Sequence, residues 1–105
     1  MQDLPYISAS DLVSCDGIII DIRTPAEHEE KRLAQPHILV PLDQLDAHAF
    51  MADNNVPADK PVLILCRSGR RAIPAAEIFI SSGYPNVKII EGGILACEAH
   101  GIDVE

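Results

Sequence analysis

Residues 61–66 read Pro-Val-Leu-Ile-Leu-Cys, an unbroken apolar run, and residues 17–22 read Gly-Ile-Ile-Ile-Asp-Ile. Continuous runs of this length are typical of strands that are covered on both faces, as in parallel sheets. Shorter strand candidates occupy residues 38–40 and 87–90, and residues 6–7 offer an edge strand. Together these segments predict a central, mostly parallel five-stranded sheet.

Helical signals alternate with these strands along the chain. Helices are predicted over residues 8–13, 24–31, 42–51, 71–82 and 94–100. The start at Thr24 is the clearest, because a capping threonine, a proline in the first turn and Glu27 three positions later are typical of a helix N-terminus. Strands that alternate with helices at this spacing predict one α/β domain over residues 1–105, with the sheet flanked by helices.

Composition and charge argue against several classes of function. The chain has 105 residues, 48% of them hydrophobic. That suits one globular domain, which buries roughly 65% of its unfolded surface. Eight Lys and Arg residues against 16 Asp and Glu residues leave a formal charge of -8. Because an acidic surface repels phosphate backbones and anionic membranes, no nucleic-acid partner and no membrane partner are predicted.

The cysteine count bears on the cellular compartment. Cys15, Cys66 and Cys97 are an odd number and include no Cys-x-x-Cys pair. A disulfide framework is therefore not predicted, and a free thiol suits a reducing compartment. The N-terminus also lacks the basic start and apolar stretch of a secretory signal. We predict a cytoplasmic location, with Cys15 and Cys97 packed in the core.

The sequence contains no recognisable metal or nucleotide motif. The four histidines are spread along the chain without the spacing of metal ligands; they are His28, His37, His48 and His100. No metal site is predicted from them, and a surface role is expected for His37. The Gly-Gly pair at 92–93 is too short a signal for a nucleotide-binding loop. No cofactor is predicted.

The chemistry is expected in residues 66–72, which read Cys-Arg-Ser-Gly-Arg-Arg-Ala. They follow a buried strand and precede a helix, at the carboxyl edge where sites of parallel sheets form. Three of the eight cations stand within five consecutive positions. Thiols beside arginines and a helix N-terminus often have pKa values of roughly 3.5–7.5, and Gly69 lets the backbone curl. We predict an anion cradle of backbone N–H groups, with an exposed Cys66 thiolate at its base.

This loop resembles the active-site loop of the rhodanese-type sulfurtransferases, which commonly reads Cys-Arg-Ser-Gly-x-Arg followed by a small residue. Three further segments resemble motifs of that family in the same order. Residues 20–28 are similar to Asp-Val-Arg-x-x-x-Glu-Tyr/Phe, residues 40–45 to Ile-Pro-Leu-x-x-Leu, and residues 87–93 to Val-x-x-Leu-x-Gly-Gly. Because order and spacing agree over nearly the whole chain, the resemblance is to a single-domain rhodanese.

The resemblance implies a sulfurtransferase in which Cys66 is the catalytic nucleophile and becomes a persulfide. The implied donor is thiosulfate or a low-molecular-weight persulfide, and the acceptor is cyanide or a thiol, with a protein acceptor also possible, in a double displacement. The loop residues implied to bind substrate are Arg67, Ser68, Gly69, Arg70 and Arg71. Arg23 follows a strand at the same sheet edge, where it either binds substrate or pairs with Glu27 or Glu91.

Two segments depart from the family pattern. Ile94 stands where Trp usually follows the Gly-Gly turn, and residues 31–37 replace the usual Gly-His-Ile-Pro-Gly-Ala. Both changes fall near expected pocket or packing regions, so they bear on substrate preference more than on the cysteine chemistry.

Two alternatives stay open. A cysteine-dependent phosphatase or arsenate reductase needs Cys, five residues and then Arg, but that position holds Ala72, and Arg71 comes one residue early. One residue spans up to ~3.5 Å of chain, so the shorter loop suits a single sulfur better than a tetrahedral phosphate. The other alternative is a non-turnover persulfide carrier, which would use the same Cys66, or a regulatory module.

Overall fold

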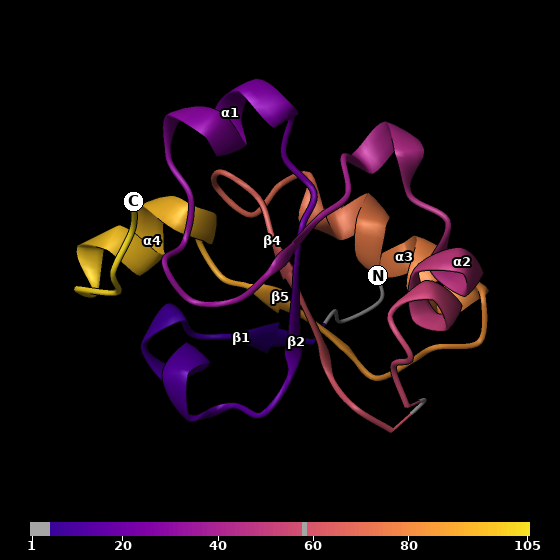
Figure 1. Ribbon diagram of the computed structural model, residues 1–105. Helices are drawn as coiled ribbons and strands as arrows, with labels where there is room; N and C mark the ends of the chain where they lie inside the picture. Colours follow the sequence, from indigo (N-terminus) through magenta and orange to yellow (C-terminus); the bar gives the residue numbers. More distant parts are fainter. Residues whose placement is uncertain (1–4, 58) are drawn as a thin grey trace.

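The computed structural model describes residues 5–57 and 59–105 and contains a five-stranded sheet in which all neighbouring strands are parallel (Figure 1). The strands are β1 (Tyr6–Ile7), β2 (Ile18–Asp21), β3 (Ile38–Leu39), β4 (Val62–Leu65) and β5 (Val87–Ile90), in the spatial order β1-β5-β4-β2-β3. The predicted α/β fold with a five-stranded parallel sheet is confirmed. The predicted domain limits include residues 1–4 and 58, which lie outside the described residues.

Helices connect the strands at the predicted places. They are α1 (Pro25–Glu30), α2 (Ala47–Asp53), α3 (Ala72–Ser81) and α4 (Gly93–Ala99), with the 3-10 helices η1 (Ala9–Ser14) and η2 (Leu42–Gln44). The capping box that opens α1 is present. The hydroxyl of Thr24 accepts the N–H of Glu27 at 3.2 Å, and the Glu27 carboxylate accepts the N–H of Thr24 at 3.1 Å.

The prediction of one continuous helix over residues 42–51 is wrong. The chain forms η2, continues through an extended Leu45, and starts α2 only after Asp46. The physical reason is a second helix cap: Asp46 Oδ1 accepts the N–H of Ala49 at 3.1 Å, which satisfies a free donor at the start of α2. The predicted helix at residues 8–13 is likewise the short 3-10 helix η1.

The sheet is covered on both faces, which explains the unbroken apolar runs. On one face, β4 contributes Val62 and Ile64 to a core that contains the rings of Phe50 in α2 and Phe79 in α3, with ring centroids 5.8 Å apart. The opposite face is covered by η1 and α4, and these helices pack on Leu63 and the neighbouring strand residues. In Figure 1, α2 and α3 lie to one side of the sheet and α4 to the other.

The parallel arrangement places the carboxyl ends of the strands at one edge. There the chain leaves β2 after Asp21, β4 after Leu65 and β5 after Ile90. Figure 1 shows α1 at this end of the molecule, beside the loop that follows β4. Segments from three distant parts of the sequence therefore meet around Cys66. Within the described residues, no helix has the length and apolarity needed to cross a membrane.

Candidate active site

The loop after β4 turns back on the cysteine that begins it. The backbone N–H of Gly69 donates a hydrogen bond to Sγ of Cys66 at 2.9 Å. Gly69 adopts a φ of +103°, which residues with a side chain rarely adopt, so the predicted curl at this glycine is confirmed. Helix α3 then starts at Ala72, directly after the loop.

The side chain of Cys66 is more enclosed than predicted. Its exposed fraction is 1%, and it belongs to the apolar cluster that includes Ile64 and Ala72. The expectation of an exposed thiolate is therefore wrong for this conformation of the loop. The reason lies in the strand direction: Val62, Ile64 and Cys66 alternate onto the same face, which is the face that α3 covers. Among the described residues, one backbone N–H reaches the sulfur, where the sequence predicted several.

The Gly-Gly turn holds the base of this loop, a role that sequence reasoning missed. The N–H groups of Ile94 and Leu95, at the start of α4, donate to the carbonyl oxygens of Cys66 and Arg67 at 2.9 and 3.3 Å. Gly93 adopts a φ of +62°, and a Cβ atom there would overlap both carbonyl oxygens. The backbone of α4 can approach the loop this closely only because residue 93 is glycine.

Arg71, at the other end of the loop, is held by a carboxylate from α1. Its Nη1 and Nη2 atoms each lie 2.8 Å from one oxygen of Glu27. The hydroxyl of Thr24 also donates to this carboxylate, at 3.1 Å. The hydrogen bonds from Arg71 lower the pKa of Glu27 from 4.5 to about 2, and Glu27 in turn raises the pKa of Arg71. Arg71 is thus an anchored cation, 36% exposed, at the margin of the loop.

Arg23 is held by hydrogen bonds at the carboxyl edge of the sheet. It is 3% exposed, and its guanidinium binds the buried carboxylate of Asp21, with Nη2 to Oδ2 at 2.8 Å. It also donates to the carbonyl oxygens of Lys31 at 2.7 Å and Glu27 at 3.4 Å. The predicted side-chain partners Glu27 and Glu91 are wrong; the partner is Asp21. Of the two roles expected for Arg23, this geometry favours the structural one.

The remaining loop side chains face solvent. Arg67, Ser68 and Arg70 are exposed. Within residues 5–57 and 59–105, the guanidinium groups of Arg67 and Arg70 have no hydrogen-bond or ion-pair partner. Arg67 lines a pocket of about 160 Å³ together with Lys31 and two glutamates of α1, and Lys31 itself pairs with Glu98.

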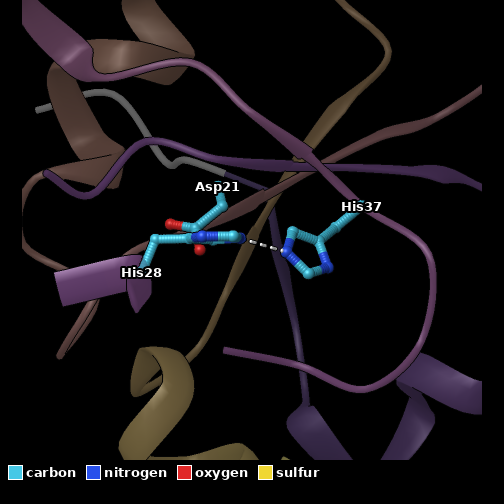
Figure 2. Close-up of side chains that lie close together, drawn as sticks. All are labelled: Asp21, His28 and His37. Carbon is cyan, nitrogen blue, oxygen red and sulfur yellow. Dashed lines mark hydrogen bonds between the residues drawn. The ribbon is translucent and has the colours of Figure 1, made fainter. Parts of the chain in front are cut away.

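Two of the histidines, which are spread along the sequence without the spacing of metal ligands, meet in the structure. Nε2 of His28 and Nε2 of His37 are 2.8 Å apart, and the Asp21 carboxylate lies close to both (Figure 2). Burial, and then the neighbouring His37, lower the pKa of His28. The nine-residue separation matches no ligand motif, so the sequence offered no signal for this contact. His37 is half-buried rather than on the surface.

The other two cysteines are distinct from Cys66. Cys97 lies in α4 and is fully buried in the core, which confirms its predicted packing, and burial raises the pKa of its thiol to about 11. Cys15 is half-buried against the same core. All three cysteines are free. Cys66 is therefore the cysteine whose sulfur lies in a loop at the carboxyl edge of the sheet.

Comparisons with known proteins agree with this arrangement. The family model described as rhodanese-like domain matches residues 8–100. A protein of Allochromatium vinosum named sulfurtransferase is 38% identical over 90 residues, which cover 85% of this chain and 78% of that protein. A rhodanese domain-containing protein of Drosophila melanogaster is 33% identical over 73% of this chain and 78% of its own length. The crystal structure of a rhodanese-related protein from Thermoplasma volcanium superposes with a TM-score of 0.75 at 26% identity, covering 96% of this chain and 97% of the other.

Proposed function

This chain belongs to the rhodanese-like domain family, a family of sulfurtransferases, and we propose that it transfers a sulfane sulfur through a persulfide on Cys66. The observation that carries the proposal is the Gly69 N–H held 2.9 Å from Sγ in a loop that also contains the exposed arginines Arg67 and Arg70. A backbone N–H aimed at sulfur stabilises negative charge there. The proposed location is the cytoplasm, because a thiol that must cycle suits a reducing compartment.

The proposed reaction has two displacements. In the first, the Cys66 thiolate attacks the outer sulfur of thiosulfate, the S–S bond of thiosulfate breaks, and sulfite leaves with the bonding electron pair. Cys66 then carries the outer sulfur as a persulfide anion. In the second, cyanide or a thiolate attacks that sulfur, the S–S bond to Cys66 breaks, and thiocyanate or a new persulfide leaves while the Cys66 thiolate is restored. A low-molecular-weight persulfide can replace thiosulfate as donor.

The residues around Cys66 divide this work. Arg67 and Arg70 attract the anionic donor and stabilise the sulfite that leaves, because both are exposed cations in the loop that begins at Cys66. Ser68 offers a hydroxyl donor at the same exposed face. Arg71 stays with Glu27, so it contributes positive charge from a fixed position. Because Cys66 is 1% exposed, access of a donor to Sγ requires the residues around it to move apart.

A second candidate function shares the same cysteine. The burial of Cys66 favours a persulfide carrier whose protein acceptor opens the loop on binding. Turnover with small thiols supports the enzyme, whereas transfer that depends on one particular protein supports the carrier. The phosphatase reading lacks support, because Ala72 stands at the required arginine position and is the first residue of α3.

Intact-mass measurement after incubation with thiosulfate tests the proposal. The wild-type protein is expected to gain one sulfur atom, the Cys66→Ala variant none, and the matched Cys97→Ala variant one. Thiocyanate formation from thiosulfate and cyanide should follow the same pattern. A sulfur that Cys66→Ala retains, or phosphate release from an aryl phosphate without thiocyanate formation, contradicts the proposal.

A further inference from the structure

A cluster of three ligand-type side chains lies at the carboxyl end of β2, and its histidines have no assigned role in sulfur transfer. Asp21 ends β2, His28 lies in α1, and His37 lies just before β3. One ligand atom from each residue lies within 4.8 Å of the others (Figure 2). Figure 2 shows the two imidazole rings directed toward each other, with the carboxylate beside the His28 ring.

The hydrogen bonds define which nitrogen atoms carry protons. Nδ1 of His37 lies 2.9 Å from the carbonyl oxygen of Gln35, and a carbonyl only accepts, so this Nδ1 carries the proton. In neutral His37 the Nε2 atom then has a free lone pair. Nε2 of His28, 2.8 Å away, donates its proton to that lone pair. One proton, carried by Nε2 of His28, therefore links the two Nε2 atoms.

We propose that this proton can be replaced by a divalent transition-metal ion such as Zn²⁺, bound by Nε2 of His28, Nε2 of His37 and one oxygen of Asp21. When the proton of His28 moves from Nε2 to Nδ1, the lone pair of His28 Nε2 becomes free to bind the metal as well. Water completes the coordination, as in zinc sites with three protein ligands.

The two histidines need only a small adjustment. Nitrogen ligands at 2.0–2.1 Å from tetrahedral Zn²⁺ are roughly 3.3 Å apart, whereas these two are 2.8 Å apart. The rings must therefore separate by roughly 0.5 Å. Two imidazoles and one carboxylate suit Zn²⁺, Ni²⁺ or Cu²⁺ and not Ca²⁺, which needs six to eight oxygen ligands.

Neighbouring groups orient one of the three ligands and lower the expected affinity for the metal. The carbonyl of Gln35 orients His37, an arrangement common for metal-binding histidines. Arg23 binds both carboxylate oxygens of Asp21 and so competes for its lone pairs. Arg32 donates to the carbonyl oxygen of His28 at 3.3 Å and adds a second nearby cation. We therefore expect these two cations to weaken metal binding.

Calorimetric titration of the untagged protein with ZnCl₂ tests the proposal. The titration uses the Cys66→Ala variant as background, since a thiolate is itself a zinc ligand. We expect one equivalent bound, with an affinity at least tenfold weaker in His28→Gln and in His37→Gln. His100→Gln is the matched control, because His100 is exposed and outside the cluster, and its affinity should equal that of the background.

A second measurement does not depend on any histidine substitution. Ring signals of His28 and His37 in NMR spectra should shift with sub-stoichiometric Zn²⁺, while those of His48 and His100 stay in place. Co²⁺ in the same protein should give tetrahedral d–d bands without sulfur-to-cobalt charge transfer. Shifts at His48 or His100 alone, or an affinity that neither His28→Gln nor His37→Gln changes, would overturn the proposal.

Discussion

Glu27 and Arg71 form a two-pronged ion pair that joins α1 to the end of the cysteine loop, with both oxygen-to-nitrogen distances at 2.8 Å. The two residues are 44 positions apart in the sequence. Glu27 belongs at the same time to the capping box of α1, through Thr24. One carboxylate thus connects the folding of a short helix to the placement of a cation beside Cys66.

The stability contributed by this pair should depend on pH. The pKa of Glu27 is lowered from 4.5 to about 2, so its stabilisation is complete above pH 4.5 and is lost as the pH falls toward 2. Glu27→Gln should lower the free energy of unfolding by about 1–2 kcal/mol at pH 7, an amount discounted for the partial exposure of the pair. Urea unfolding at pH 7, 5 and 3 measures the difference in unfolding free energy between wild type and Glu27→Gln. This difference should be smaller at pH 3 than at pH 7.

Glu29→Gln is the matched control, because it removes the same charge from an exposed position of the same helix. It should leave the unfolding free energy within about 0.5 kcal/mol of wild type. A difference between Glu27→Gln and wild type that is equally large at pH 7 and pH 3 would contradict a contribution from the ionised pair.

Gly93→Ala should damage both stability and sulfur transfer. The added Cβ atom would overlap the carbonyl oxygens of Cys66 and Arg67, so the start of α4 must move away from the loop. Gly101→Ala is the control, because Gly101 has a similar positive φ of +78° but open space around it. We expect the control to lose about 1 kcal/mol, the cost of a left-handed backbone for a residue with a side chain, and Gly93→Ala about 3 kcal/mol or more. Thermal unfolding measures the stability of both variants. Equal losses of stability would contradict a steric overlap of the added Cβ atom at residue 93 with the loop.

Arg67→Ala and Arg70→Ala should each reduce kcat/KM for thiosulfate by about tenfold, which corresponds to about 1.4 kcal/mol. Their thermal stability should not change, because both side chains are exposed. Lys60→Ala removes one positive charge next to the opposite, amino end of β4 and should leave kcat/KM unchanged. Steady-state thiocyanate formation measures the effect. Raising the salt concentration should shrink the difference between wild type and the arginine variants, and a salt-independent difference would contradict the role of charge.

Arg23→Lys separates the two roles considered for Arg23. A lysine keeps the charge but cannot reproduce the fork that binds Asp21 and the two carbonyl oxygens at the ends of α1. We expect a loss of about 2–3 kcal/mol in unfolding free energy, with KM for thiosulfate unchanged at a temperature where the variant is folded. A raised KM with unchanged stability would instead assign Arg23 to the substrate.

Local patterns were sufficient to predict much of the fold. The apolar runs of β2 and β4 indicated strands covered on both faces, because a strand buried on both faces is apolar at most of its positions. The cap at Thr24 was readable because it involves residues only three positions apart. The break before Asp46 was missed, since the apolar spacing of residues 42–51 suits a helix and gives no sign that a new cap interrupts it.

The site divides in the same way. The sequence by itself determined which cysteine is the candidate nucleophile and how the loop around it is built, because strand, glycine and arginines are neighbours in the chain. The tertiary structure alone decided that Arg71 binds Glu27, that Gly93 supports the loop, that Cys66 is enclosed, and that His28 meets His37. These features all arise where the parallel sheet brings distant segments to one edge. The distance between such segments depends on strand order and helix packing rather than on their separation along the chain.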